Sequence, residues 1–378
     1  MITIEGKYAN ADVYVSSYEN LDSASYGQIT QLLSVPCVEG QNIAIMPDVH
    51  CGISCVIGYT QTFTDKIVPN LVGVDVCCGV LVCKISSDYH FDYARLDKVI
   101  RQGIPCGMAH RKTYHKFTKN VDLSSLVADA DKEKLLLSVG SLGSGNHFIS
   151  VEVDSEGNSC IVIHSGSRHL GDVVCRFHQQ RAIQRYLKNR SETGDKTQLP
   201  SNFAWLDGSD TEDYLNDMHI CNNFADWNRK AMLDVILDGM DIKSRYILDE
   251  FTTKHNYVDV DNRIIRKGAI SLQDGERAII PMNMRDGSLI VTGKGNQKAN
   301  YSGPHGAGRI LSRSAAKQGL SMEEFKKSMD GIYSTSVRQS TIDESPMAYK
   351  PMSAIIENIG DMCTVESVIK PAYNFKAS

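Results

Sequence analysis

The stretch from residue 71 to residue 85, LVGVDVCCGVLVCKI, constrains the fold and the chemistry of this chain more than any other. Its valine, leucine and isoleucine residues are typical of a buried strand. Asp75 and Cys78 interrupt the apolar run with two side chains that bind metals. The neighbouring glycines allow backbone to approach a ligand closely. We expect a strand over Leu71–Ile85, with Leu71–Val74 placing Asp75 and Cys78 near a strand end.

Four histidines lie beside small residues in other parts of the chain. They are His147 in GSLGSGNHF, His164 in VIHSGSR, His255 in KHNYV and His305 in SGPHGAGR. A single histidine of this kind is usually an ordinary hydrogen-bonded residue. Four of them, together with Asp75 and Cys78, suggest one buried inorganic site, for a metal or a phosphate, assembled from distant segments.

The donor set is too large for one structural zinc ion, which takes four ligands. A thiolate, a carboxylate and three of these imidazoles fit two adjacent metals that share a bridging ligand. The ligand types leave zinc and manganese open. Two close metals are the arrangement used for phosphoryl and nucleotidyl transfer, because they stabilise the attacking and leaving oxygens together.

Length and composition indicate one globular unit. The 378 residues are 42% hydrophobic and 22% charged, with no linker, repeat or low-complexity tract, so we expect a single domain over residues 1–378. The net charge of -5 argues against a basic, non-specific nucleic-acid binder, although a local basic groove is compatible with it. No secretory signal and no membrane-spanning run are apparent. The eleven cysteines then indicate free thiols in a reducing, cytoplasmic location.

The local patterns predict a mixed α/β fold. The strand-like runs are Asn42–Met46, Ile53–Tyr59, Leu71–Ile85, Cys160–His164, Arg277–Pro281, Ser288–Thr292 and Met362–Ile369. The helical runs are Asp172–Lys188, Thr211–Gly239, Arg309–Gln318 and Met322–Asp330. We expect capping boxes at Ser209/Glu212 and Ser321/Glu324, helix-ending glycines at Gly319 and Gly331, and a polar loop over 189–201. Strands and helices do not alternate regularly, which argues against a Rossmann fold or a TIM barrel.

The glycine-rich loop Gly140–Gly145 matches no standard nucleotide motif. Its glycines are not spaced as in the dinucleotide fingerprint, and it lacks the Gly-Lys-Ser/Thr ending of a Walker A loop. Its interest comes from the Asn-His pair that follows it. The segment His164–Arg168 similarly combines a ligand, hydroxyls and a guanidinium, which can hold a phosphate through two hydrogen bonds.

These segments resemble, in order, the motifs of the RtcB family of RNA-splicing ligases. The motifs are PDVHCGISCVIG, VGVDVCCG, GSLGSGNHF, HSGSR, HNYV, RKGA, SGPHGAGR, DESPMAYK and the terminal NFK, and they run from about residue 40 to the C-terminus. The resemblance implies a single-domain α/β fold of its own type, with central mixed sheets around a pocket for two Mn²⁺ ions per subunit. It also implies a GTP-dependent reaction that joins an RNA 3′-phosphate or 2′,3′-cyclic phosphate to a 5′-hydroxyl end.

The resemblance assigns roles to individual residues. Asp75, Cys78, His147, His164 and His255 are the implied metal ligands, with Cys78 as the bridge. His305 is the implied nucleophile, which would form a covalent histidine–GMP. The implied nucleotide contacts are Asn146, Asn256, Gly306, Ala307, Gly308, Tyr349 and Lys376. Arg168 and Arg309 are the implied contacts to RNA phosphates. No membrane association is expected, and the sequence identifies no protein partner.

Three departures from the family pattern bear on specificity. The family glutamate three residues after the Asn-His histidine, which reads guanine, is replaced by Ser150, and Glu152 lies two residues further on, on the same strand face. A hydroxyl cannot accept two N–H groups as a carboxylate can, so the choice between GTP and ATP is open. The stretch Ile280–Gly287 reads IPMNMRDG in place of IPGSMG, and Cys77 replaces a glycine. We interpret the chain as a divergent paralogue that repairs specific broken tRNA or rRNA.

Two other classes compete with RNA ligation. A metal-dependent phosphoesterase acting on cyclic phosphate ends would use the same metals without a nucleotide, but it would not need His305 in PHGAGR. A catalytically silent RNA-binding relative would have no use for a complete and costly cluster of buried ligands, and the net acidity also argues against it. We rank the ligase first, the phosphoesterase second and the binding protein third.

Overall fold

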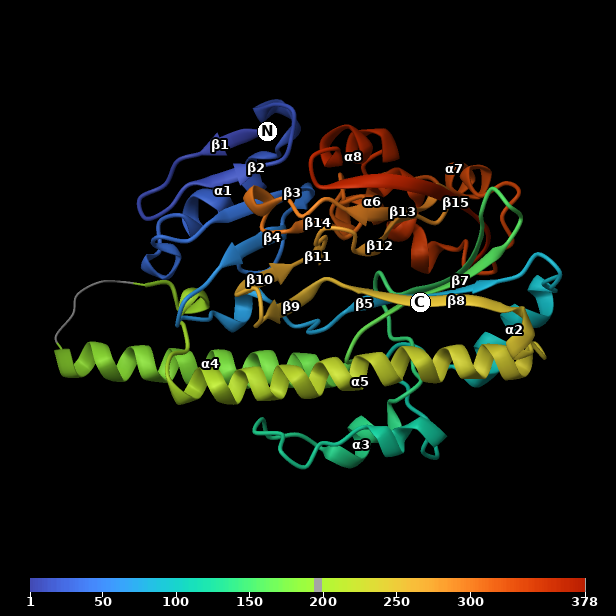
Figure 1. Ribbon diagram of the computed structural model, residues 1–378, viewed down its shortest axis with the longest axis horizontal. Coiled ribbons are helices and arrows are strands. Elements are labelled where there is room, and N and C mark those ends of the chain that lie inside the picture. Colours follow the sequence, from blue (N-terminus) through green and yellow to red (C-terminus); the bar gives the residue numbers. More distant parts are fainter. Residues whose placement is uncertain (194–198, 378) are drawn as a thin grey trace.

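Two β-sheets and a pair of long helices frame the protein in the computed structural model, which describes residues 1–193 and 199–377 (Figure 1). The larger sheet has seven strands, and each pair of neighbours is antiparallel. Its strands, in spatial order, are β12 (Arg277–Asn283), β13 (Gly287–Gly293), β15 (Cys363–Lys376), β6 (Phe148–Val153), β7 (Ser159–Ser165), β5 (Gly79–Ile85) and β8 (Ile247–Lys254).

The second sheet is mixed, because β2 and β3 pair in parallel while its other neighbours are antiparallel. Its order is β1 (Ile2–Ile4), β2 (Ala11–Val13), β3 (Ile43–His50), β4 (Ile57–Thr62), β10 (Ile264–Lys267) and β9 (Asn256–Asp259). A short antiparallel pair, β11 (Ala269–Ser271) and β14 (Ser302–Pro304), lies between the two sheets and contacts β8, β4 and β3.

The long helices α4 (His169–Thr193) and α5 (Ser209–Gly239) run antiparallel along one side of the sheets (Figure 1). The apolar residues of α5 recur every three or four positions, and the structure buries them, including Tyr214, Met218 and Cys221. The shorter helices are α1 (Ser23–Leu32), α2 (Tyr93–Gly103), α3 (Lys132–Leu137), α6 (Arg313–Gly319), α7 (Met322–Ser328) and α8 (Met352–Ile359). Helix α2 packs on α5, and α3 lies on the side of α5 away from the sheets (Figure 1).

The mixed α/β architecture predicted from the sequence is confirmed, and its main error concerns the first half of Leu71–Ile85. Residues 71–78 form the end of a 3-10 turn (Pro69–Leu71) and a tight bend, and β5 begins only at Gly79. Gly73 and Cys77 have φ values of +91° and +58°, which an extended strand does not use. Asp75 and Cys78 therefore precede the strand instead of ending it.

Several predicted helix ends were also wrong. The N-cap residue of α5 is Gly208, which has no side chain to cap the helix, and Ser209 is already the first helical residue. The predicted Ser209/Glu212 capping box therefore does not form. Helix α6 starts at Arg313 after the N-cap Ser312, and Gly319 is its last residue. Ser321 does cap α7, although Gly331 lies beyond the end of that helix at Ser328.

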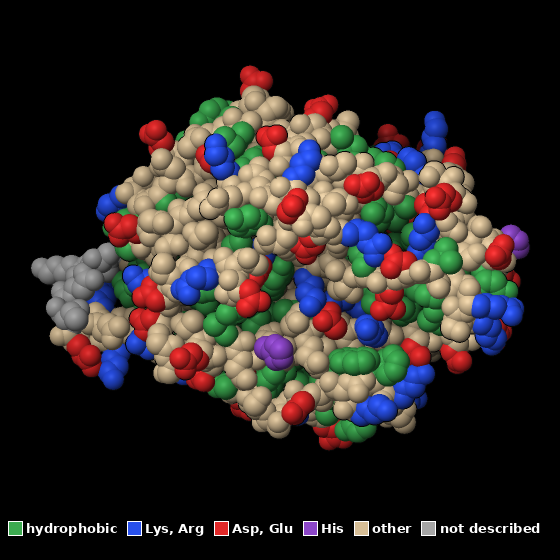
Figure 2. All heavy atoms as spheres, viewed as in Figure 1, with side chains coloured by type: hydrophobic (Ala, Val, Ile, Leu, Met, Phe, Trp, Pro, Cys, Tyr) green, Lys and Arg blue, Asp and Glu red, His purple; other side chains and the backbone are tan. Residues whose placement is uncertain are grey.

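The predicted loop over 189–201 is largely helix in its first part, because α4 continues to Thr193. Residues 194–198 of that prediction lie outside the described residues. Among the described helices none combines the length and the apolar character needed to cross a bilayer. On the face shown in Figure 2, basic and acidic side chains are interspersed, as the small net charge suggests.

Candidate metal centre

Asp75 and Cys78 lie on a bend that backbone hydrogen bonds hold in place. The Cys78 amide donates to the Asp75 carbonyl at 3.2 Å, and the Cys77 amide donates to the Asn256 carbonyl at 2.7 Å. Cys77 adopts the left-handed conformation, which a non-glycine residue occupies only at a cost. The bend turns the Cys78 thiol toward the histidines that follow.

The three histidines predicted as ligands come from neighbouring strand ends. His147 immediately precedes β6, His164 lies near the end of β7, and His255 lies between β8 and β9. Strand β5 lies between β7 and β8 and pairs with both, so its start meets the ends of those strands. Residues separated by up to 180 positions in the chain therefore meet at one edge of the sheet.

The donor atoms of these residues converge. The Cys78 Sγ lies 3.4 Å from the Nε2 of His147 and 3.2 Å from the Nε2 of His164. His147 Nε2 lies 3.1 Å from Asp75 Oδ2, and the Nε2 atoms of His164 and His255 are 3.4 Å apart. Spacings of roughly 3.3 Å are those between ligands on one ion, since metal–nitrogen bonds are about 2.1 Å long.

Two groups of donors share Cys78: one adds His164 and His255, and the other adds Asp75 and His147. This is the geometry expected for two adjacent metals bridged by a thiolate. The sequence prediction that these five residues lie together agrees with the structure. The ligands combine one soft thiolate with imidazoles and a carboxylate, a set that is compatible with both zinc and manganese.

The buried histidines and the cysteine of the site differ in their readiness to bind a metal. Burial and the neighbouring imidazoles hold the pKa of His164 and of His255 well below the ordinary value, so both rings are neutral ligands. Burial and the Asp75 carboxylate raise the pKa of the Cys78 thiol well above its usual range. A thiolate at Cys78 therefore requires a bound cation, and metal binding would release a proton from it.

His147 has its tautomer fixed by a hydrogen bond on its far side. Its Nδ1 lies 2.9 Å from the Leu142 carbonyl, which accepts a hydrogen bond and leaves Nε2 free for a metal. Burial alone would raise the pKa of Asp75, but the adjacent His147 lowers it below the ordinary value. Asp75 is the only one of the five ligands that is not fully buried.

His305, the predicted nucleophile, lies against the metal-ligand cluster. Its ring centroid is 4.8 Å from that of His255. Its Nδ1 lies 2.6 Å from Oδ2 of the fully buried Asp48, and the same oxygen accepts from the His305 amide at 3.1 Å. A carboxylate on Nδ1 keeps the proton there and leaves Nε2 as a lone-pair donor, the state that a nucleophilic imidazole needs.

The glycines after His305 fit this arrangement closely. Gly308 has a φ of +73°, and a Cβ there would lie 2.2 Å from the Asp48 carbonyl oxygen. Gly306 lies beside the Pro281 carbonyl, and the Ala307 side chain is buried in the apolar core. These residues therefore fix the loop that carries His305 against the segment that carries Asp48.

Lys376 and Tyr349, both predicted as nucleotide contacts, meet at the buried Glu344. The Lys376 Nζ lies 2.5 Å from Glu344 Oε2 and donates to the Asn146 carbonyl at 3.3 Å. The Tyr349 hydroxyl donates to Glu344 at 2.7 Å. The cations around Glu344 outweigh its burial and hold its pKa at about 2, so it is ionised at neutral pH.

The two predicted RNA-phosphate arginines differ in their surroundings. The Arg309 guanidinium donates hydrogen bonds to groups of the protein itself, namely Glu344, the Tyr349 hydroxyl and the Leu311 and Asp343 carbonyls. Arg168 donates to Ser141 and to the Gly107 carbonyl beside the glycine-rich loop. Arg313, which the sequence reading did not single out, is half-exposed and bonds Asp343 and Glu344.

The two predicted asparagine contacts also differ. The Asn256 side chain bonds the Asp75 carbonyl at 3.0 Å and the Gly268 amide at 2.7 Å, which braces the bend that carries two ligands. Asn146 is partly exposed next to His147, and its carbonyl accepts from Lys376. Asn146 is thus the better placed of the two to contact a bound group.

Ser150 and Glu152 share one face of β6, as the strand period predicts. The Ser150 hydroxyl donates to Glu152 Oε1 at 2.7 Å, and Ser150 pairs across the strands with Asn374. Burial raises the pKa of Glu152 to about 7. Within the described part of the chain, Glu152 Oε2 and Asn374 Oδ1 are buried without a hydrogen-bond partner. This face is therefore polar and incompletely satisfied.

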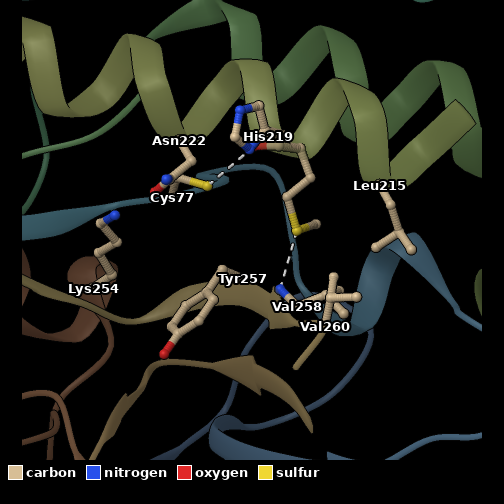
Figure 3. A pocket seen from close by; sticks show the side chains of 9 residues that line it. Cys77, Leu215, His219, Asn222, Lys254, Tyr257, Val258 and Val260 are labelled. Atoms are coloured by element: carbon tan, nitrogen blue, oxygen red, sulfur yellow. Dashed lines mark hydrogen bonds between the residues drawn. The ribbon is translucent and has the colours of Figure 1, made fainter. Parts of the chain in front are cut away.

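Cys77 does not face the metal ligands. Its side chain lies in the wall of a separate cavity of about 180 Å³ between α5 and β9, with Met218, His219 and Lys254 around it (Figure 3). Burial raises the pKa of this thiol to about 12. Cys77 is thus a protonated, weakly reactive thiol behind the centre.

Helix α5 contributes two buried residues that brace the ligand loops. Asn228 accepts from the Gly140 and Ser141 amides at 2.8 and 3.0 Å and donates to Ser165 and to the Gly166 carbonyl. Arg229 donates to the Ser165 carbonyl at 2.7 Å and, more weakly, to that of Cys77. One helix thus fixes the three segments that carry Cys78, His147 and His164.

Asp48 and Glu344 are the two important residues that the sequence reading missed. Asp48 lies in the segment PDVHCG and Glu344 in the segment DESPMAYK, both of which carry the family resemblance. A carboxylate flanked by proline or serine in an otherwise apolar or small-residue segment was the available signal. Their partners, His305 and Lys376, lie far away in the sequence, so the pairing itself could not be read.

Comparisons with known proteins all match the chain to one family. The model of the family described as "tRNA-splicing ligase RtcB" matches residues 28–131 and 118–377. The chain is 30% identical over 363 residues to the RNA-splicing ligase RtcB of Escherichia coli strain K12, covering 86% of this chain and 87% of that protein. It is 26% identical to the RNA-splicing ligase RtcB of Mycobacterium tuberculosis, covering 87% and 95%. The tRNA-splicing ligase RtcB of Aeropyrum pernix is 25% identical, covering 87% and 86%.

Proposed function

Because the chain belongs to the RtcB family of tRNA-splicing ligases, we propose that it is an RNA ligase. It joins an RNA 3′-phosphate or 2′,3′-cyclic phosphate end to a 5′-hydroxyl end, with GTP as the energy source and two Mn²⁺ ions as the metals. The observation that carries this proposal is His305, whose Nδ1 is held by Asp48 at 2.6 Å while its ring lies beside a metal ligand.

His305 would act as the nucleophile. Its Nε2 attacks the α-phosphorus of the nucleotide, pyrophosphate leaves, and a histidine–GMP forms. The guanylate then passes to the RNA 3′-phosphate, and a cyclic end must first be opened by water. The 5′-hydroxyl attacks the activated phosphorus and GMP leaves. Asp48 stabilises the positive charge that develops on the imidazole as its Nε2 forms the bond to phosphorus.

Asp75, Cys78, His147, His164 and His255 would hold the metals. Bound there, the ions would neutralise negative charge on the transferred phosphate. Lys376 and Tyr349 lie near Asn146 through the Glu344 network, which is consistent with a nucleotide site at the end of β15. In this proposal Gly306, Ala307 and Gly308 line the ribose, and Arg168 contacts RNA.

The base of the nucleotide is the least constrained part of the proposal. Ser150 replaces the glutamate that the family uses to read guanine, and the Glu152 carboxyl is bonded to Ser150 on a buried face. We expect GTP to be used with weaker discrimination against ATP than in relatives that have the glutamate.

We expect a cytoplasmic location and repair of specific broken tRNA or rRNA. Equal rates on nicked tRNA and nicked rRNA fragments would argue against that specialisation.

The test is a ligation assay with two short RNAs, one ending in a 3′-phosphate and one beginning with a 5′-hydroxyl. The metallated protein is incubated with GTP, with ATP or without nucleotide, and the products are separated on a denaturing gel. We expect nucleotide-dependent joining that His305→Ala abolishes. Opening of a cyclic phosphate without joining, independent of nucleotide, would favour the phosphoesterase function instead.

A further inference from the structure

The second half of α2 and the chain that follows it carry a basic stretch in an acidic protein. Residues 98–121 contain six lysines and arginines and no aspartate or glutamate, while the whole chain has a net charge of -5. The part from Met108 to Lys119, MAHRKTYHKFTK, is the most concentrated region, and we refer to it as the 108–119 segment. Such a local reversal of charge marks a surface for a polyanion.

Backbone contacts tie the start of this segment to the loop that ends in a metal ligand. The Gly107 amide donates to the Gly143 carbonyl at 2.8 Å, and the Leu142 amide donates to the Pro105 carbonyl at 2.9 Å. Leu142 is also the residue whose carbonyl orients His147. The 108–119 segment thus begins beside the loop that carries His147.

Arg168, which the resemblance implies as an RNA-phosphate contact, bonds the residue that precedes the segment. Its Nη2 donates to the Gly107 carbonyl at 2.9 Å, and its guanidinium passes directly over Gly143. A Cβ at Gly143 would lie 1.9 Å from Arg168 Nη1, so only glycine allows this approach. A strand that reaches Arg168 from outside therefore meets Gly107 and the start of the segment next.

The segment has a fixed shape. The Arg111 guanidinium donates to the carbonyls of Gly103, Val139 and Gly140 from inside. Further along, the Phe117 ring packs on Trp227 of α5 with centroids 5.3 Å apart. The segment is therefore a preformed surface that would lose little conformational entropy on binding.

Its outward side chains suit a nucleic-acid strand. Met108 and Tyr114 are 87% and 53% exposed, which is unusual for large apolar side chains. Lys112 and Lys119 are exposed and have no ion-pair partner among the described residues, whereas Lys116 is paired with Asp234. Lysines with free charge can neutralise phosphates, and an exposed tyrosine offers a surface on which a base can stack.

We propose that the 108–119 segment binds the RNA strand whose end lies at the metal centre, with Lys112 and Lys119 on phosphates and Tyr114 against a base. The inference rests on the proposed function, because it assumes that RNA ends are brought to the centre. An acidic protein surface would also fit the charge. RNA is favoured because Arg168 and Gly107 make the segment continuous with the centre.

The test uses the full chain with the triple substitution Lys112→Glu/Tyr114→Ala/Lys119→Glu. The dissociation constant for a fluorescent single-stranded RNA with a 3′-phosphate is measured by anisotropy at several salt concentrations. We expect binding to weaken by about tenfold or more, and the slope of log K against log salt to fall by about 1.4, since two phosphate contacts are lost. Lys112→Arg/Lys119→Arg should bind as the unmodified protein does.

The matched control is Lys7→Glu/Lys298→Glu, which makes the same charge change at two exposed lysines, one between β1 and β2 and the other in the 3-10 turn that contacts β3. Covalent labelling by the nucleotide needs no RNA, so all variants should be labelled at the unmodified rate, which also shows that they fold. Unchanged RNA affinity in the triple variant, or an equal loss in the control, would overturn the proposal. Failure of labelling in the unmodified protein would instead count against the proposed function.

Discussion

Replacing Asp48 by Asn should slow nucleotide transfer to His305 without removing the metal centre. Asp48 is fully buried, and its Oδ2 lies 2.6 Å from His305 Nδ1. Asparagine has almost the same size, so the main change is the loss of a negative charge. A hydrogen bond to a charged group is worth about 1.5–3 kcal/mol, which corresponds to roughly a 10- to 150-fold effect on rate.

The change also affects the tautomer of the ring. An asparagine that presents its NH₂ group to Nδ1 would favour the proton on Nε2, which removes the attacking lone pair. In a serine protease the equivalent substitution costs about 10⁴ in rate. We therefore expect the labelling rate to fall by roughly 10- to 150-fold if the tautomer is unchanged, and by up to about 10⁴-fold if it changes.

The assay is the rate of covalent labelling with α-labelled GTP, measured beside the bound-metal content. Asp217→Asn is a matched control, because it alters a second fully buried carboxylate–imidazole pair, with His178 at 2.9 Å, away from the centre. Metal content should be unchanged in Asp48→Asn, and the control should label at the unmodified rate. Labelling of Asp48→Asn at the unmodified rate would refute the role given to Asp48.

Three further changes test the energetics of the site. Burial raises the pKa of Glu152 to about 7, so between about pH 4.5 and 7 the folded state keeps a proton that the unfolded state loses, and ionisation destabilises the fold at higher pH. Measured by urea unfolding, Glu152→Gln should therefore stabilise the protein by about 3 kcal/mol at pH 8 and have little effect at pH 4. Glu344 has a pKa of about 2, so its contribution to the free energy of unfolding is fully present above about pH 4.5 and is lost as the pH falls toward 2. Glu344→Gln should lower the free energy of unfolding by about 3 kcal/mol at pH 7, partly because it leaves Lys376 buried and unpaired, and an unchanged unfolding midpoint would contradict this. Asn228→Ala removes four hydrogen bonds to the ligand loops and should weaken Mn²⁺ binding by about 10- to 100-fold in a metal titration, whereas Asn222→Ala on the same helix should not.

The sequence predicted the members of the centre better than their local structure. Glycine-flanked histidines and the Asp75–Cys78 spacing identified five side chains whose donor atoms do converge. The strand assigned to Leu71–Val74 was wrong, because an apolar run does not distinguish a strand from a buried 3-10 turn. Positive φ values at Gly73 and Cys77 decide the outcome, and the second of these is unusual for cysteine.

Long-range pairings could not be predicted. Asp48 and His305 are 257 positions apart, and Glu344 gathers charged partners from β15 and from the residues around α6. Such contacts depend on how the sheets pack, which periodicity does not encode. The engagement of Arg309 and Asn256 by the protein interior likewise appears only in three dimensions.

The most direct test of the account is whether His305 becomes covalently attached to a nucleotide. The metallated protein is incubated with α-labelled GTP, or separately with α-labelled ATP, and then denatured and analysed for acid-labile label, with His305→Ala alongside. We expect a GTP adduct that the variant lacks. An adduct that survives in His305→Ala, or none with either nucleotide in a protein shown to contain its metals, would contradict the central claim.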